Sequence, residues 1–169
     1  MQALGIVGWS GSGKTSLLTA LIPIFRRAGL RVSSIKHAHH SLAFDTPGKD
    51  SFRHAQAGAE EVILMSDGGF ALFSAQREAS LEELLGRLAP VDLVLVEGFK
   101  DAAIPKLEIH RPSLGQAPIW PSMNMLAVAS DGPLPDCPLP VLPLQAPSEI
   151  ADFLRQALSL NNHKQIERF

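Results

Sequence analysis

Hydrophobic positions in the first part of the chain change from a continuous run to helical spacing and back. Ala3 to Val7 is a continuous apolar run followed by glycine, which is typical of a buried strand. From Thr15 to Phe25 the apolar residues recur at helical spacing, which predicts a helix, and Pro23 is expected to kink it because proline has no N–H to donate. Residues 30–36 predict a second strand. Strand, helix and strand within about 36 residues form a βαβ unit, so we expect a parallel pair.

The rest of the chain continues the alternation of strands and helices. Two apolar runs around the turn "DGG" predict an antiparallel hairpin at residues 61–75, and Ser80 with Glu83 forms a capping box at the start of a helix. Further strands are predicted at "VDLVLVEGFK", "KLEIHR", "MLAVASDG" and "LPVLPL", and a closing helix at "SEIADFLRQAL". The pattern predicts one three-layer α/β domain over residues 1–160, with a mostly parallel sheet, and a frayed tail at 161–169.

Composition and charge narrow the class of protein. The chain has 169 residues, of which 46% are hydrophobic and 19% are charged, so it is globular rather than disordered. The formal net charge of -2 disfavours nucleic acid as a partner. The single cysteine, Cys137, cannot form an internal disulfide, which fits a reducing compartment, and no apolar run reaches the roughly 18 residues of a membrane span. We expect a cytoplasmic protein with neither a nucleic-acid nor a membrane partner.

The stretch "GWSGSGKTS", residues 8–16, fits the phosphate-binding pattern G-x-x-x-x-G-K-[ST] and lies between a predicted strand and a predicted helix. Glycines let backbone N–H groups surround phosphate oxygens, and the start of the helix attracts the same anion. Lys14 adds a point charge, and the Thr15 hydroxyl can ligate Mg²⁺. A turn that merely links strand to helix needs neither three glycines nor a lysine. The nucleotide-binding candidates in this loop are Gly8, Ser10, Gly11, Ser12, Gly13, Lys14, Thr15 and Ser16.

A second group on the metal side is expected at the carboxyl end of a neighbouring strand, where ligands gather in open α/β sheets. Asp92 and Glu97 flank the apolar run "LVLV" and lie roughly 16 Å apart at about 3.3 Å per residue, so they cannot share one ion. Glu97 ends the strand and is the candidate metal ligand with Thr15, or the residue that positions water. Asp92 is expected to be a strand-start residue in solvent. The alternative for Glu97 is an ordinary loop carboxylate.

The polar segment from residue 37 to residue 50 is longer than a plain connection needs, and such loops are commonly functional. Asp50 precedes a predicted short helix, so it is an N-cap residue, an acid near the γ-phosphate, or both. Lys49 and Arg53 lie beside it. The candidate catalytic residues are therefore Lys14, Glu97 and Asp50.

Three histidines, His37, His39 and His40, are candidate ligands of zinc or nickel, but no cysteine or second histidine cluster lies nearby in the sequence. We favour histidines in solvent or histidines that meet an anionic ligand. With Lys49, these side chains predict that a second, phosphate-bearing ligand binds the loop on the nucleotide side of the sheet.

Ser130 and Asp131 end another buried strand. The Asp131 carboxylate can accept from both N–H groups on the Watson–Crick edge of guanine, whereas adenine offers that carboxylate no matching pair. Asp131 and Gly132 are also a common turn pair, so a purely local role stays open. The late position of the strand favours guanine, because guanine-reading loops lie there in GTP-binding folds.

Five segments together resemble the molybdopterin-guanine dinucleotide biosynthesis protein B family: "GWSGSGKTS", "IKHAHH", "DTPGKDSFRHAQAGA", "LVEGFK" and "PKLEIHR". The resemblance implies a P-loop NTPase fold in a dimeric protein that binds GTP and hydrolyses it weakly. It implies a partner enzyme, protein A, which joins GMP to molybdopterin. It also implies phosphate contacts from Gly11 to Ser16, a metal side formed by Thr15 and Glu97, and base recognition by Asp131.

The same resemblance makes molybdopterin a candidate ligand beside GTP and Mg²⁺. Residues 45–53, together with Lys100 and Lys106, become a candidate surface for a phosphate-bearing pterin or for the partner enzyme.

Two other functions stay open. Nickel-delivering maturation GTPases are related, but their urease members carry a Cys-Pro-His motif, and Cys137-Pro138 is followed here by Leu139. A small-molecule kinase needs an acceptor site and usually a lid of arginines, and "FKDAAIPK" offers only lysines.

A pure adaptor and a slow GTPase cannot be separated by sequence. Hydrolysis is expected to be slow, because no glutamine or arginine is obviously placed for catalysis. The apolar faces of the hairpin at residues 61–75 predict a homodimer.

Overall fold

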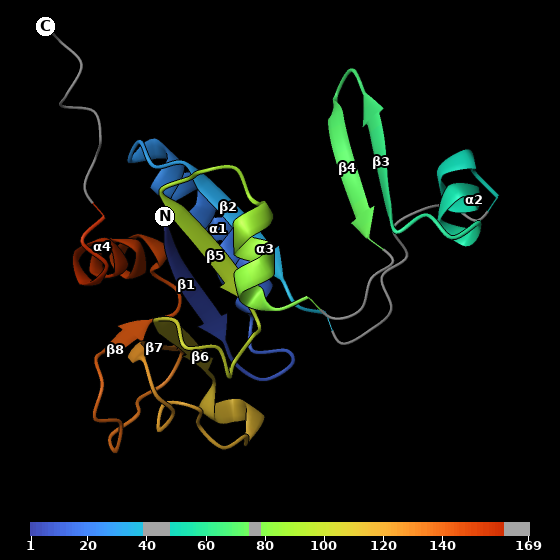
Figure 1. The fold of residues 1–169 in the computed structure, drawn as a ribbon. Helices are drawn as coiled ribbons and strands as arrows, with labels where there is room; N and C mark the ends of the chain where they lie inside the picture. Colours follow the sequence, from blue (N-terminus) through green and yellow to red (C-terminus); the bar gives the residue numbers. More distant parts are fainter. Residues whose placement is uncertain (39–47, 75–78, 161–169) are drawn as a thin grey trace, which may run out of the picture. The chain divides into compact units, whose positions relative to one another are not determined.

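The chain divides into two compact units, and the larger one is built on a six-stranded sheet (Figure 1). This computed structural model describes residues 1–38, 48–74 and 79–160. The strands follow in the order β2-β5-β1-β6-β7-β8, and every neighbouring pair is parallel. Their bounds are β1 Gln2–Val7, β2 Val32–Lys36, β5 Leu93–Glu97, β6 Lys106–His110, β7 Met125–Ser130 and β8 Val141–Pro143. The predicted α/β class with a mostly parallel sheet is confirmed. The proline-containing strand β8 lies at the edge of the sheet, where a residue without an N–H is tolerated.

β1 and β2 are parallel but are not neighbours, because β5 lies between them. The parallel orientation expected for these two strands is confirmed, but a third strand separates them. Burial explains the order. All five residues of β5 are buried, so this strand requires a neighbour on each edge and cover on both faces. β2 carries partly exposed residues along its length and suits the outer position.

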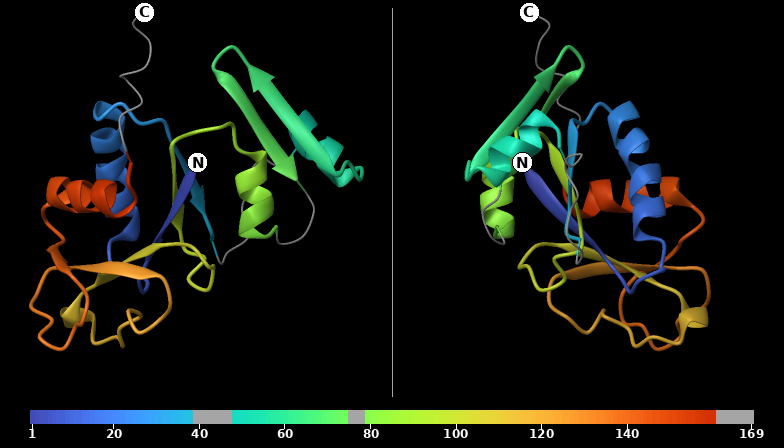
Figure 2. Two further views of the ribbon diagram at one scale, coloured as in Figure 1. Left: turned by 60° about the vertical axis from the view of Figure 1, so that its left-hand side comes forward. Right: turned by 90° about the vertical axis from the view of Figure 1, so that its right-hand side faces the viewer.

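Two helices, α1 (Lys14–Arg27) and α4 (Pro147–Ala157), contact each other on one face of the sheet (Figure 2). Their apolar residues recur at helical spacing, which produces the buried face that the sequence predicts. The fully buried side chains that join both helices to the sheet core are Leu21, Phe25, Ile150 and Leu154. α1 runs unbroken through Pro23, which lies on its exposed side, so the proline does not end the helix.

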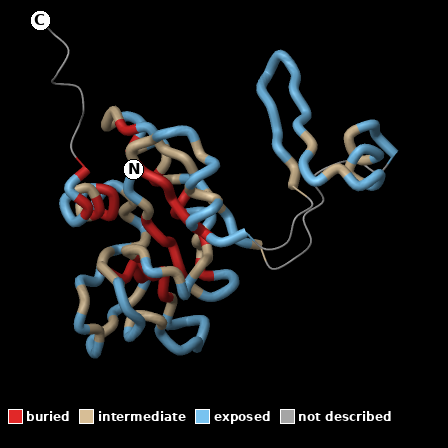
Figure 3. The backbone as a smooth tube through the Cα atoms, in the orientation of Figure 1, coloured by how far each residue is buried: buried red, intermediate tan, exposed pale blue. Residues whose placement is uncertain are grey.

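The smaller unit, Ala38–Gly86, contains the predicted antiparallel hairpin. The elements that begin in this unit are α2 Asp50–Gln56, β3 Glu61–Ser66, β4 Gly69–Ser74 and α3 Leu81–Arg87. Most of the hairpin is exposed, as its pale-blue tube in Figure 3 shows. Met65 is 81% exposed and Phe70, its cross-strand partner, is 75% exposed. The described part of the chain therefore leaves a large apolar surface uncovered, as the sequence indicates.

The helix starts in this region give one confirmation and one correction. The capping box is confirmed, because the Ser80 N–H donates to Glu83 Oε2 at 2.7 Å and the Glu83 N–H donates to Ser80 Oγ at 3.2 Å. The N-cap role of Asp50 is wrong: α2 begins at Asp50, the N-cap position falls on Lys49, and no side chain caps that helix. The single domain over residues 1–160 stays a prediction, and the tail at 161–169 lies outside the described residues. None of the described helices is long and apolar enough to cross a membrane.

Candidate nucleotide-binding site

The glycine loop, residues 8–13, connects β1 to α1, as the sequence predicts. Gly8 is held at a φ of 151°, and a Cβ on it would lie 2.6 Å from both Ile109 O and Ser12 Oγ, so no larger residue fits. Gly11 and Gly13 have φ values of 77° and 101°, and no atom lies within 4 Å of where their Cβ atoms would be. The backbone therefore needs glycine at three points and leaves open space beside two of them.

The first backbone N–H groups of α1 have no hydrogen-bond acceptor within the helix. Its first helical hydrogen bond runs from the Leu17 N–H to Gly13 O, at 2.9 Å. No side chain caps the helix, and its first turn contains no acid. The N–H groups of Lys14, Thr15 and Ser16 therefore have no helical acceptor, and with the positive end of the helix they favour an anion.

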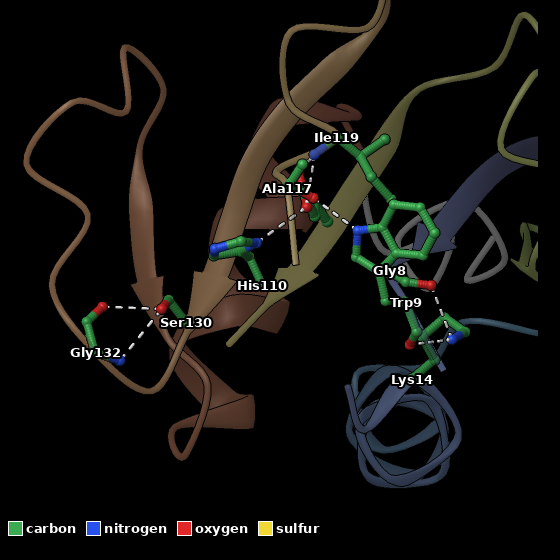
Figure 4. Close-up of polar contacts among 9 residues, drawn as sticks. Gly8, Trp9, Lys14, His110, Ala117, Ile119, Ser130 and Gly132 are labelled. Carbon is green, nitrogen blue, oxygen red and sulfur yellow. Dashed lines mark hydrogen bonds and ion pairs between the residues drawn. The ribbon is translucent and has the colours of Figure 1, made fainter. Parts of the chain in front are cut away.

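Lys14 lies folded over this loop (Figure 4). Its Nζ donates to the carbonyl oxygens of Gly8 and Trp9, at 3.0 and 2.9 Å. Burial lowers the pKa of Lys14; the nearby Glu97 carboxylate opposes this shift, and the Lys36 ammonium adds to it. The ammonium is thus held at the loop by two neutral carbonyls, partners that an anion can readily replace.

Thr15 and Glu97 meet although 82 residues separate them in the sequence. The Thr15 hydroxyl lies 2.9 and 3.0 Å from the two carboxylate oxygens of Glu97. The sheet produces this contact, because Ile6 of β1 is in register with Glu97 at the carboxyl end of β5. The side chain of Glu97 is only 9% exposed. The expectation that these two residues share one side of the site is matched by their geometry, while their role as metal ligands stays a prediction.

Lys36 is part of the same cluster and was not among the site residues predicted from the sequence. Its Nζ lies 3.3 Å from Glu97 Oε1 and 3.4 Å from Thr15 Oγ1. Lys36 is the last residue of β2 and is in register with Glu97. Lys36, like Glu97, ends a strand of the parallel sheet, where ligands gather, so the sequence carries the same signal for both residues.

Asp92 lies at the other end of β5 and is not in solvent, contrary to expectation. Its side chain is 12% exposed. The carboxylate accepts from the Arg31 N–H at 2.7 Å and lies 3.2 Å from the Arg31 guanidinium. It joins the amino ends of β2 and β5, which is a structural role.

A segment between β6 and β7 is held beside the glycine loop (Figure 4). The Trp9 indole N–H donates to Ala117 O at 2.7 Å. Both carboxylate oxygens of Glu108 accept from the Ile119 N–H, at 2.9 and 3.0 Å, and His110 Nδ1 lies 3.5 Å from Glu108. Burial raises the pKa of Glu108, and the backbone N–H of Ile119 opposes that shift. Neither Trp9 nor Glu108 was predicted from the sequence as a site residue. For Glu108, the polar position inside the apolar strand "KLEIH" was the available signal.

The candidate base-recognition residues follow β7. Ser130 is buried, and its hydroxyl donates to Gly132 O at 2.9 Å and accepts from the Gly132 N–H at 3.2 Å. The Asp131 carboxylate lies 2.8 Å from Arg111 Nε. Ser130 thus shapes a local turn, and Asp131 has an intramolecular partner. Recognition of a base by these residues stays a prediction.

The proposed second-ligand residues are scattered. His37 stacks on Phe99 with ring centroids 4.5 Å apart, and Lys100 lies in the exposed turn that follows. Lys106 does not belong to an exposed surface: it is buried, its Nζ donates to Met123 O at 3.3 Å, and burial lowers its pKa. This part of the predicted surface is wrong, because Lys106 begins the interior strand β6.

The remaining candidates belong to the smaller unit or lie outside the described residues. Lys49 and Arg53 are in the smaller unit, where Arg53 lies 3.9 Å from the highly exposed Asp50 carboxylate. His39 and His40 lie outside the described residues. Across residues 1–38, 48–74 and 79–160, no three histidine, cysteine, aspartate or glutamate side chains are grouped as a metal site.

Comparisons with known proteins agree with this architecture. Residues 3–131 match the family model described as molybdopterin guanine dinucleotide synthesis protein B. The chain belongs to this family. A relative from Haemophilus influenzae, named molybdopterin-guanine dinucleotide biosynthesis adapter protein, is 41% identical over 158 residues, which is 92% of this chain and 88% of the relative. A relative of the same name from Escherichia coli is 37% identical over 166 residues, 94% of each chain.

A solved structure supports the same assignment. The crystal structure of a MobB protein homolog from Bacillus stearothermophilus has a TM-score of 0.74 and 27% identity, and covers 94% of this chain and 99% of its own. The resemblance found in the sequence motifs is therefore confirmed. None of these matches names a nickel-delivering protein or a kinase.

Proposed function

We propose that the chain binds GTP with Mg²⁺ at the glycine loop and acts as an adaptor in the synthesis of the guanine dinucleotide form of molybdopterin. Family membership and the adapter names of the relatives support the pathway and the adaptor role. The observation that carries the nucleotide part is the contact of Thr15 with Glu97 beside the start of α1, where the first N–H groups have no helical acceptor and no described side chain caps the helix. This contact places a hydroxyl and a carboxylate that could ligate Mg²⁺ beside a helix start that could bind an anion.

The residues present fit a nucleotide and its metal ion. Open space lies beside Gly11 and Gly13, and Ser12 Oγ is buried without a hydrogen-bond partner among the described residues. Thr15 and Glu97 are hard oxygen ligands of the kind that Mg²⁺ prefers, and Mg²⁺ would neutralise phosphate charge there. The chain's own part is to bind and orient: the helix start and Lys14 would hold the phosphates once Lys14 leaves the two loop carbonyls.

Asp131 is the proposed reader of guanine. It follows the strand two places from β1, on the edge of the sheet where the other site residues lie. A guanine bound there would have to compete with the guanidinium of Arg111 for the carboxylate. Asp131 must therefore bind the base by exchange of one partner for another, not as a free acceptor.

We infer that hydrolysis is weak and that the protein serves as a homodimer beside the partner enzyme, protein A. The described side-chain contacts of Glu97 come from Thr15 and Lys36, so none is with a glutamine or arginine of the kind that speeds phosphoryl transfer. The exposed hairpin supports a second copy as partner. The catalytic role of Asp50, and molybdopterin as a second ligand near residues 45–53, remain part of the proposal.

The test is calorimetry of GTP·Mg²⁺ binding to Lys14→Ala. Loss of the ammonium from the phosphates should weaken binding by about 2–4 kcal/mol. Arg26→Ala is the matched control, because it removes the same charge from the exposed far end of α1. Equal GTP affinity in Lys14→Ala and the wild type would overturn the site.

The base is tested separately. Asp131→Asn should lose its preference for GTP over ATP by about tenfold or more and should gain affinity for xanthosine triphosphate, whose 2-position offers a carbonyl to the amide. Asp136→Asn, an exposed change in the same loop, should keep the wild-type preference. Competition in which ATP displaces GTP equally from the wild-type protein would exclude guanine selection.

A further inference from the structure

Lys36 lies where a positive charge is needed between the two metal-side groups. Its ammonium is 3.3 Å from Glu97 Oε1 and 3.4 Å from Thr15 Oγ1, while the Thr15 hydroxyl itself contacts both oxygens of Glu97. One cation thus faces both the carboxylate and the hydroxyl to which the proposed function assigns Mg²⁺. The inference that follows rests on that assignment.

We propose that the Lys36 ammonium takes the place of the divalent cation in the nucleotide-free protein, so that Glu97 and Thr15 accept Mg²⁺ only when nucleotide phosphates enter with it. In this role Lys36 is a positioning residue: it keeps the Glu97 carboxylate neutralised and directed at Thr15 until the nucleotide arrives.

The charges near Glu97 support this order of events. The Lys36 ammonium contacts Glu97 directly, and the ammonium of Lys14, the residue before Thr15, lies at the carbonyl oxygens of Gly8 and Trp9 in the same site. A lone divalent cation would therefore meet one carboxylate already paired with the Lys36 ammonium, with a second ammonium in the same site, and it would be repelled. The phosphates of a nucleotide reverse that balance, because they attract Lys14, Lys36 and the cation together.

A purely structural ion pair is the competing explanation. The side chain of Lys36 is 58% exposed, and exposed pairs contribute little to stability. Such a pair would leave metal binding by the nucleotide-free protein unchanged when the lysine is removed. Competition predicts that removal of the ammonium creates a metal site, which is an observable gain.

The experiment measures Mn²⁺ binding to the full chain without nucleotide, from the electron paramagnetic resonance signal of free Mn²⁺. Lys36→Met keeps the length of the side chain and removes its charge, and it should bind Mn²⁺ about tenfold or more tighter than the wild type. Lys36→Arg keeps the charge and should remain close to the wild type. Arg26→Met removes the same charge at the far end of α1 and should leave Mn²⁺ affinity unchanged.

Two results would overturn the inference. Equal Mn²⁺ affinity in Lys36→Met and the wild type would show that the ammonium does not compete. A gain that persists in Lys36→Met/Glu97→Gln would show that the new site does not use Glu97. Neither result touches GTP binding at the glycine loop, which Lys14→Ala tests, so the two proposals fail separately.

Discussion

The six-stranded sheet and the hairpin β3–β4 are both rich in apolar residues, yet they sort polar and apolar side chains in opposite ways. The sheet encloses Leu95 and Val96 completely and also buries two carboxylates, Glu97 and Glu108. The hairpin exposes most of its apolar surface, and Met65 is 81% exposed. An apolar run therefore predicts a strand, but what covers the strand depends on its neighbours.

The number of neighbours separates the two regions. β5 is hydrogen-bonded on both edges, to β1 and to β2, and both of its faces are closed. Within the described part of the chain, β3 and β4 pair only with each other. A two-stranded hairpin is marginal in water by itself, so its apolar faces need a cover that the six-stranded sheet already has.

The largest effect is expected when one leucine in each region is replaced by alanine and the two losses of stability are compared. Leu95→Ala removes a fully buried side chain and should lower the free energy of unfolding by about 2–5 kcal/mol, from lost burial and the cavity left behind. Leu64→Ala, on the exposed hairpin, should change the unfolding of the larger unit by no more than about 0.5 kcal/mol. Urea unfolding at one protein concentration measures both, because Trp9 and Trp120 report on the larger unit. Equal losses would remove the distinction between the two sheets.

The elements of both regions could be predicted locally, because hydrophobic periodicity, glycine and capping residues act over a few positions. Glu97 was selected because it ends an apolar strand. The strand order was not predictable in this way, since the place of β5 between β1 and β2 is set by packing of segments 60 and 90 residues apart. The contact of Lys36 with Glu97 depends on the same strand order, although the position of Lys36 at the end of a predicted strand was a signal in the sequence.

Buried polar contacts were the least predictable part of the site. Nothing local in "KLEIH" states that Glu108 accepts from the Ile119 N–H or that Lys106 is buried. Both contacts depend on how the irregular segment from Arg111 to Asn124 folds back, and proline-punctuated loops give no periodic signal.

The next largest effect is expected for the dimer interface that would bury the hairpin. If a second copy buries it, Met65→Glu should weaken the homodimer by about tenfold or more, because the new charge would be desolvated at the interface. Light scattering over a micromolar concentration series measures the mass. Met123→Glu is the matched control: Met123 is 82% exposed and lies in the larger unit, away from the hairpin in sequence.

Two outcomes would contradict this prediction. A wild-type protein that is monomeric throughout the series would exclude the homodimer. A Met123→Glu variant that dissociates as readily as Met65→Glu would place the interface outside the hairpin or make it unspecific.

The smallest effect is expected for Glu108, the carboxylate buried inside the six-stranded sheet. Burial raises the pKa of Glu108 above its ordinary value of 4.5, so the folded protein favours the protonated carboxyl. The stability from this preference is complete below the unfolded-state pKa and is lost as the pH rises through the raised folded-state pKa.

In Glu108→Gln the side chain does not titrate. The variant's Tm should therefore rise relative to the wild type as the pH increases above about 4.5. His110, 3.5 Å away, opposes the raised pKa of Glu108 and so reduces the effect. Glu82→Gln, the same change at an exposed glutamate of α3, serves as the control in thermal unfolding across this pH range. A Tm difference between Glu108→Gln and the wild type that stays constant with pH would mean that Glu108 keeps its ordinary titration in spite of complete burial.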